Sequence, residues 1–169
     1  VRRPARPVAD HLAVGADGDD TGGELRGAVY ILFMNANGTV RSSTKIASGL
    51  NGAPTLTGLA HFGVSVASLG DFDGDGVNDL AVGSWDGAQV GIYRGAVHVL
   101  LMNTNGTVKS STKISSSTNG GPALANYDRF GVGVSSLGDL DGDGVTDLAV
   151  GTYQDDTGAI RECIYQGGG

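Results

Sequence analysis

The sequence contains few cysteines, prolines and long apolar runs, and these scarcities exclude several classes of protein. A single cysteine, Cys163, cannot form an internal disulfide framework. With only four prolines in 169 residues and no glycine at every third position, neither a collagen triple helix nor proline-rich disorder is expected. No apolar run reaches the roughly 18 residues that cross a membrane, so we expect a soluble chain without membrane insertion.

Basic residues are also in the minority, since 11 Lys and Arg face 18 Asp and Glu and leave a formal net charge of −7. This balance disfavours nucleic acid as a partner, because nucleic acid selects basic surfaces. Glycine, in contrast, is abundant: 30 of the 169 residues, against a usual share of roughly 7%. With 40% apolar residues available for a core, the glycines predict many tight turns between short strands.

The sequence repeats itself at an offset of 68 residues. Residues 61–84 align without gaps on residues 129–152, with six differences in 24 positions, and residues 26–46 align on residues 94–114. At this period the 169 residues hold about 2.5 units. The fold must therefore be one in which a single structural unit is repeated.

Each unit is predicted to be a four-stranded antiparallel meander without helices. The strands of the complete unit are expected at residues 63–69, 80–83, 95–102 and 107–114. The second is apolar enough to be covered on both faces, whereas the fourth alternates like an outer strand. Residues 103–106 predict a tight hairpin connection, because their Asn-Gly pair tolerates the positive φ that such turns require.

A sheet of 68 residues cannot bury both of its own faces, so the units are expected to stack. Near-identical four-stranded sheets stacked around an axis form a β-propeller, whereas solenoids usually repeat every 20 to 47 residues or so. We predict an all-β fold of propeller blades in one repeat region over residues 1–169. It comprises a partial blade at 11–46, a full blade at 62–114 and a partial blade at 130–165 that stops within or before its third strand; residues 1–10 and 166–169 are expected to be aberrant or disordered ends.

Two nine-residue loops hold eight of the 18 carboxylates, and glycines supply the sharp bends between them. Carboxylates this close repel one another unless a cation neutralises them, and hard oxygen ligands select Ca²⁺ or, less well, Mg²⁺. The main-chain carbonyl at the seventh position adds a further ligand. The sequence predicts two Ca²⁺ ions per chain, with these ligands: Asp71, Asp73, Asp75, Val77 and Asp79, and Asp139, Asp141, Asp143, Val145 and Asp147.

An EF-hand is the first alternative, because it shares the opening pattern of the loop. It also needs a bidentate glutamate at position twelve and flanking helices. Position twelve is Val82 in one loop and Val150 in the other, and each loop leads into a strand. The EF-hand is therefore excluded, and a solvated acidic turn remains as the alternative without a metal.

These residues resemble the FG-GAP repeat of integrin α-subunit propellers and of many bacterial surface and secreted proteins. Phe62 and Gly63 open the unit, the acidic loop follows, and Asp-Leu-Ala-Val-Gly comes after it, so that the resemblance covers roughly residues 11–160. It implies blades of four strands, with Ca²⁺ held between the first and second strands. It also implies that the loops at the other end contact a ligand, and that the protein is extracellular or at the cell surface.

No catalytic constellation is found, so the chain is not expected to be an enzyme. None of the three histidines recurs at the repeat offset, and Cys163 has no histidine partner to activate it. Loops on a rigid scaffold often carry recognition, and four aromatic residues lie in or beside them: Trp85, Tyr93, Tyr127 and Tyr153. They are candidates to bind a protein or glycan ligand, with packing between blades as the alternative.

We therefore expect a calcium-binding, non-catalytic interaction or adhesion module. The alternatives are a non-catalytic segment of a larger secreted enzyme, and a structural propeller fragment without a ligand. Because about 2.5 units cannot close a ring of roughly four to eight blades, we expect a homo-oligomer. In this oligomer, residues 130–137 of one copy would complete the first sheet of the next copy. The alternative to an oligomer is that the chain is a fragment cut from a longer propeller chain.

Overall fold

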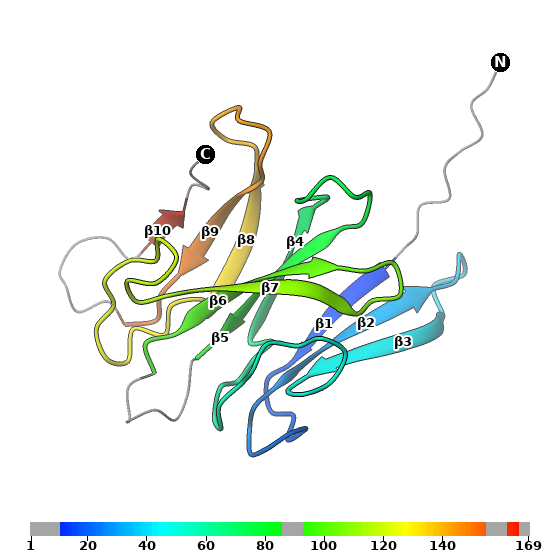
Figure 1. Cartoon of the computed structure of the whole chain (residues 1–169), viewed down its shortest axis with the longest axis horizontal. Helices are drawn as coiled ribbons and strands as arrows, with labels where there is room; N and C mark the ends of the chain where they lie inside the picture. The colour runs from blue at the N-terminus through cyan, green and yellow to red at the C-terminus, as the bar shows by residue number, and fades with distance from the viewer. Residues whose placement is uncertain (1–10, 86–92, 155–161, 166–169) are drawn as a thin grey trace.

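The computed structural model describes residues 11–85, 93–154 and 162–165, and this part of the chain is all β. Its strands form three antiparallel sheets (Figure 1). The first contains β1 (His11–Ala16), β2 (Ala28–Met34) and β3 (Val40–Ala47). The second contains β4 (Ser65–Gly70), β5 (Asp79–Ser84), β6 (Ala96–Met102) and β7 (Val108–Ser115), and the third β8 (Gly133–Gly138), β9 (Asp147–Gly151) and β10 (Glu162–Tyr165).

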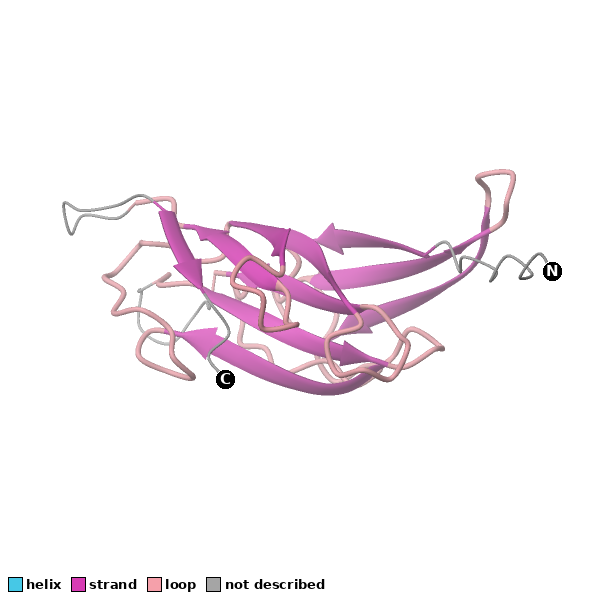
Figure 2. Cartoon of the chain, turned by 90° about the horizontal axis from the view of Figure 1, so that it is seen from above, coloured by secondary structure: helices cyan, strands magenta, loops and turns pink. Residues whose placement is uncertain are grey.

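The second sheet is the complete meander that the repeat predicts, in the order β4-β5-β6-β7. All six residues of β5 are buried, which confirms that this strand is covered on both faces, whereas the middle of the edge strand β7 is exposed. The predicted hairpin is present: the Gly106 amide donates to the Asn103 carbonyl at 2.9 Å, and Gly106 has a φ of +78°. Figure 2, turned by 90°, shows strands and connecting loops and no helix among the described residues.

The first and third sheets have three strands each among the described residues. In the first, β1 is the edge strand among those that the structure describes. In the third, β10 pairs with β9, with Glu162 opposite Gly151, so a third strand is present among the described residues. Main-chain groups make this pairing, and a segment whose side chains depart from the repeat can still form it. The ends at 1–10 and 166–169 lie outside the described residues.

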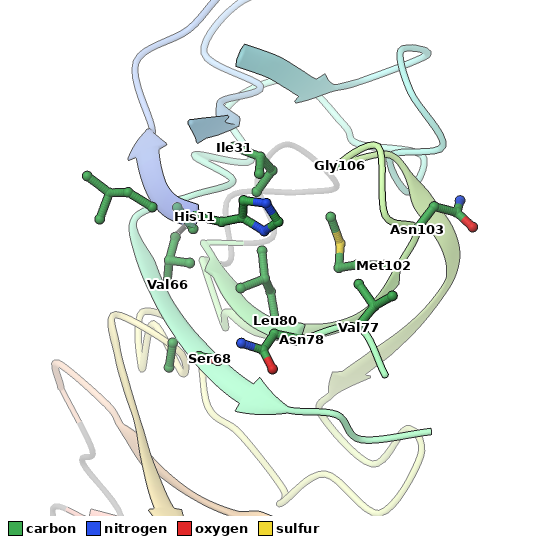
Figure 3. Close-up of a pocket in the computed structure, with 13 residues that line it drawn as sticks. His11, Ile31, Val66, Ser68, Val77, Asn78, Leu80, Met102, Asn103 and Gly106 are labelled. Atoms are coloured by element: carbon green, nitrogen blue, oxygen red, sulfur yellow. The ribbon is translucent and has the colours of Figure 1, made fainter. Parts of the chain in front are cut away.

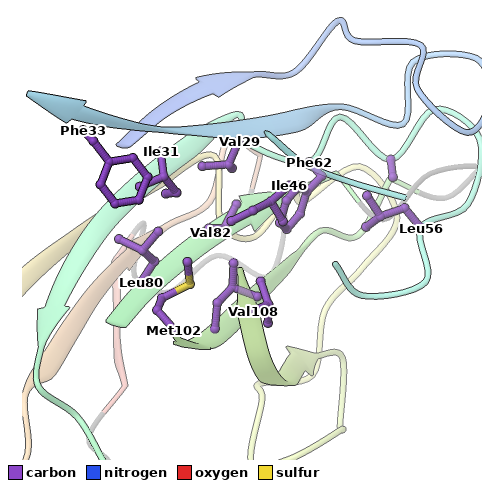
Figure 4. Close-up of a cluster of buried hydrophobic side chains, with 12 residues drawn as sticks. Val29, Ile31, Phe33, Ile46, Leu56, Phe62, Leu80, Val82, Met102 and Val108 are labelled. Carbon is purple, nitrogen blue, oxygen red and sulfur yellow. The ribbon is translucent and has the colours of Figure 1, made fainter. Parts of the chain in front are cut away.

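The core lies between neighbouring sheets, in two clusters. Figure 4 shows the first, between the first and second sheets; its largest members include Phe33, Phe62, Leu80 and Met102. The second lies between the second and third sheets and comprises Leu69, Ala81, Val97, Ile114, Phe130, Leu148 and Val150. Strand β5 contributes to both, because successive side chains of a strand point to opposite faces. This is the reason that a strand of the middle sheet must be apolar throughout.

The seams between sheets are close contacts of main chain with main chain. Gly27 pairs with Phe62 across the first seam, and Gly95 pairs with Phe130 across the second. A Cβ atom on Gly83 would collide with the carbonyl oxygen of Gly131. The glycines of the repeat therefore allow adjacent blades to touch, in addition to forming turns. Among the described residues there is also no helix long and apolar enough to cross a membrane.

Candidate metal sites

The two acidic loops connect β4 to β5 and β8 to β9, and each gathers three carboxylates. One ligand oxygen from each lies within 4.8 Å of the others in two groups: Asp71, Asp73 and Asp79, and Asp139, Asp141 and Asp147. Gly74 and Gly76 have positive φ values of +79° and +87°, which let the first loop bend back on itself. The structure thus brings together three of the four aspartates predicted for each loop.

The last aspartate of each triad is buried and fixes the loop to the sheet. Asp79 is fully buried: one carboxylate oxygen accepts a hydrogen bond from the Phe72 amide at 2.9 Å, and the other from the Met102 amide at 2.8 Å. Asp147 is 2% exposed and accepts from the Leu140 amide at 2.7 Å. These bonds close the loop and hold one carboxylate at the base of each triad.

The first aspartate of each triad is surrounded by main-chain amides of its own loop. Asp71 accepts from the Gly76 amide at 2.9 Å, and Asp139 accepts from Gly142 at 2.8 Å and Gly144 at 3.0 Å. A carboxylate offers about four lone-pair positions, so these bonds leave others for a cation. Three carboxylates with free lone pairs are a donor set that fits Ca²⁺.

The fourth predicted aspartate has a different position. An oxygen of Asp75 accepts a hydrogen bond from the Val77 amide at 2.9 Å, and an oxygen of Asp143 accepts one from the Val145 amide at 2.8 Å. These two hydrogen bonds curve the main chain of each loop. Neither belongs to the converging triad. Asp75, Asp143 and the carbonyls of Val77 and Val145 stay predictions as ligands.

Lys109, which the sequence analysis did not single out, reaches the first loop from β7. Its Nζ lies 2.5 Å from carboxylate oxygens of both Asp73 and Asp75. The hydrogen bond from Lys109 lowers the pKa of Asp75, and the bonds to Asp73 and Asp75 raise the pKa of Lys109. Among the described residues no basic side chain forms an ion pair with the second loop. In this structure the first loop is therefore paired with a lysine.

We expect Lys109→Met to strengthen calcium binding at the first loop about two- to fivefold, because the ammonium competes with the cation for Asp73. Calorimetric titration would measure the affinity of each site. Arg41→Met is the matched control: it is the equivalent residue of the first sheet, where no acidic loop is present. An unchanged calcium affinity of the first site would contradict this competition, because displacing the Lys109 ammonium would then cost no binding free energy.

The first sheet carries no such triad in its described part. At the repeat offset, His11 stands where Asp79 and Asp147 stand in the other units. Its ring packs edge-on against Phe33, with ring centroids 4.6 Å apart. An aromatic contact thus stands where the other two units have a buried carboxylate.

A second polar and aromatic cluster lies at the far end of β5 from Asp79. The Arg129 guanidinium lies over three aromatic rings, 4.8 Å from the centroid of Trp85, 5.1 Å from that of Tyr153 and 6.0 Å from that of Tyr93. Tyr153 is 65% exposed, and Tyr127 is 47% exposed. The aromatic residues predicted as ligand-binding candidates are therefore brought together at the seam of the second and third sheets, where they pack on one another and also face solvent.

Comparison with known proteins gives consistent matches. Residues 71–150 match the family described as FG-GAP-like repeat. Integrin alpha-5 of Xenopus laevis is 36% identical over 105 residues, which are 60% of this chain and 10% of that protein. Integrin alpha-4 of Xenopus laevis is 30% identical over 149 residues, 88% of this chain and 13% of that protein. Integrin alpha-PS5 of Drosophila melanogaster is 34% identical over 125 residues, 74% and 11% respectively. The chain thus spans roughly a tenth of the length of these relatives.

Proposed function

Because this chain belongs to the FG-GAP repeat family, we propose that it is a calcium-stabilised, non-catalytic segment of a β-propeller that serves adhesion or another extracellular interaction. The observation that carries the proposal is the aspartate triad, which recurs at the same place in two consecutive blades. The relatives named above are integrin alpha chains. Loops of aspartates and glycines bind calcium at the concentrations found outside cells, which supports an extracellular location.

Bound calcium would neutralise charge and join two strands. Asp71 and Asp73 belong to the loop that follows β4, whereas Asp79 is the first residue of β5. An ion held by all three would tie the end of one strand to the start of the next, as Asp139, Asp141 and Asp147 would between β8 and β9. The chain's own residues supply the rigid base, through the hydrogen bonds that Asp79 and Asp147 accept. We infer that calcium holds the blade rigid and does no chemistry.

For ligand binding we propose the cluster around Arg129. It combines a guanidinium, which pairs with carboxylates in a planar fork, with exposed tyrosine rings that stack on apolar or sugar surfaces. The Nε atoms of Arg129 and Trp85 are buried and have no hydrogen-bond partner among the described residues. A protein ligand with an acidic side chain fits this cluster, and a glycan is the alternative that the same experiment distinguishes.

We expect a peptide and glycan array probed with the calcium-loaded chain to give acidic peptide ligands. Tyr153→Ala and Arg129→Ala should each weaken such binding about tenfold or more, as residues at the centre of a binding site do. Calcium binding and melting temperature should stay unchanged in Tyr153→Ala, because this side chain is mostly exposed. Arg41→Ala, an exposed change on β3, is the control. An array without ligands, or equal losses of ligand binding in all three variants, would contradict the proposed binding site around Arg129.

We also propose that copies assemble head to tail through their terminal blades. Leu12 and Leu137 are 51% and 42% exposed, whereas their repeat equivalents Leu80 and Leu69 are 7% and 2% exposed at the internal seams. The outer faces of the two terminal sheets thus carry the residues that pack between sheets inside the chain. Donation of residues 130–137 to a second copy is disfavoured, because β8 already pairs with β9. Transferring β8 to a second copy would break its hydrogen bonds to β9 in order to form equivalent hydrogen bonds in the other copy.

Leu12→Asp is expected to abolish this assembly, because it places a charge in an apolar seam. Light scattering at micromolar protein with calcium present would give the mass. The wild-type chain should exceed the monomer mass and the variant should equal it. A monomeric wild-type chain would contradict head-to-tail assembly without affecting the calcium proposal.

A further inference from the structure

A row of side chains crosses both seams at the end of the sheets that carries Arg129. At the first seam, Nδ1 of His61 lies 3.7 Å from a carboxylate oxygen of Asp17, and the centroids of the His61 and Trp85 rings are 4.1 Å apart. At the second seam, the Arg129 guanidinium lies over Trp85 and Tyr153. This row, the seam stack, consists in order of Asp17, His61, Trp85, Arg129 and Tyr153.

The seam stack follows the sequence repeat. His61 and Arg129 are 68 residues apart, and so are Trp85 and Tyr153. His61 and Arg129 have similar φ values, +49° and +52°, and each donates its amide hydrogen to a main-chain carbonyl of the preceding blade, at 2.9 and 3.0 Å. The main chain is thus the same at both seams and the side chains differ. Arginine is always charged, whereas histidine gains and loses a proton between about pH 5 and 8.

Trp85 is shared by the two seams. His61 and Arg129 both lie within 5 Å of its ring centroid, and the face of an indole attracts a cation within about 6 Å. A proton on His61 would place a second cation beside this ring and form an ion pair with Asp17. The imidazolium and the guanidinium would then compete for one indole and repel each other. Tyr153, the other ring under Arg129, is 65% exposed, so the guanidinium can shift toward solvent without leaving an aromatic contact.

The charged groups that act on His61 are Asp17 directly and Arg129 through Trp85. Further titratable or charged side chains near His61 face solvent or have other contacts: Glu24 is exposed, Arg26 donates to the Ser48 hydroxyl, Tyr93 lies edge-on to Trp85, and His98 packs edge-on against Phe62.

We propose that His61 is a positioning residue whose protonation regulates the ligand site around Arg129; this inference rests on the function proposed above for that site. With His61 neutral, Arg129 is held against Trp85. With His61 protonated, Arg129 turns toward Tyr153 and solvent, where the carboxylate of a ligand can pair with its planar fork. The added positive charge also attracts an acidic ligand. Acidic ligands therefore bind more tightly as the pH falls through the range in which histidine gains its proton.

The first test needs no ligand, because Trp85 is the single tryptophan of the chain. A protonated imidazole accepts an electron from an excited indole more readily than a neutral one. We therefore expect the fluorescence of the calcium-loaded chain to fall as the pH is lowered from about 8 to 5. His61→Gln should abolish this dependence. A fall that persists in this variant would overturn the inference, because another group would then be sensed.

His11→Gln is the matched control for the fluorescence. Figure 3 shows the His11 ring at a separate cavity of about 270 Å³, which Val77 and Asn78 also line. These two residues come directly before β5, whereas Trp85 directly follows it. His11 therefore lies at the opposite end of the sheets, and its replacement should leave the pH dependence of the fluorescence as in the wild type.

The second test measures binding of a carboxylate probe, N-acetylaspartate N-methylamide, through the NMR signal of the Trp85 indole N–H. We expect about three- to tenfold tighter binding near pH 6 than near pH 8, as one cation–π contact permits. His61→Arg, which places at position 61 the residue that the repeat has at 129, should give the tighter affinity at both pH values. His61→Gln should give the weaker affinity at both.

The outcomes separate this inference from the proposed ligand site. Binding of the probe that is equal at the two pH values, or that depends on pH equally in the wild type and His61→Arg, would overturn the regulation and leave the ligand site standing. A probe that binds at neither pH, while the fluorescence still depends on His61, would contradict the ligand site itself and with it the regulation.

Discussion

Removal of calcium is expected to lower the melting temperature by about 10 to 20 °C. An ion that binds only the folded chain stabilises it by about 2.7 kcal/mol per site when it is a hundredfold above Kd, and we propose two sites. For a chain of this length, 1 kcal/mol shifts the melting temperature by about 2 to 4 °C. Two divalent ions would also bring the formal charge from −7 to −7 + 4 = −3. Differential scanning calorimetry with calcium and with excess chelator would measure the shift.

Variants separate the two sites. Asp73→Ala and Asp141→Ala should each remove one ion and about half of the stabilisation. Asp17→Ala is the control, because its carboxylate is 51% exposed and belongs to neither triad. Elemental analysis should find two calcium ions in the wild-type chain and one in each loop variant. A melting temperature that does not change in chelator, together with no bound metal, would contradict the sites.

The blade and most of each aspartate triad could be predicted from the sequence, because both depend on local pattern. The alternation of β7, the glycine bends and the spacing of the aspartates are all readable within a few residues. Other features depend on distant contacts. The amide that binds Asp79 belongs to Met102, 23 residues away in the chain, and Lys109 reaches the first loop from β7. Position along the chain does not reveal either contact.

The aromatic residues also show that contacts between distant segments cannot be predicted from the sequence. Their place in loops makes them candidates both for ligand binding and for packing between blades, and the sequence offers no way to choose. In the structure Arg129 lies over Trp85 and Tyr153, so that the packing and the exposed surface are made by the same side chains. The sequence reports which residues lie in loops, whereas the juxtaposition of two loops depends on how adjacent blades stack.

Gly83→Ala is expected to cause the largest loss of stability, about 3 kcal/mol or more. The added methyl group would collide with the Gly131 carbonyl oxygen and the Ser65 hydroxyl, which themselves are hydrogen-bonded at 2.6 Å. Neither can move without opening the seam of the second and third sheets, and overpacking of this kind costs about 1 to 3 kcal/mol or more. Since small domains are stable by only about 5 to 15 kcal/mol, chemical denaturation should show the loss clearly.

Gly151→Ala is the matched control, because Gly151 ends the same Leu-Ala-Val-Gly sequence in the third sheet. Among the described residues, a Cβ atom there would meet only the Gly133 carbonyl oxygen, at 3.7 Å, which is an ordinary contact. The stability of the monomer should therefore stay within about 0.5 kcal/mol of the wild type. If blades of two copies stack head to tail as they do within the chain, Gly151 takes the place of Gly83 at the new seam, and its methyl group should block assembly while leaving each monomer intact. Equal losses of stability from both substitutions would show that the cost lies in the strand itself and not in the contact between blades.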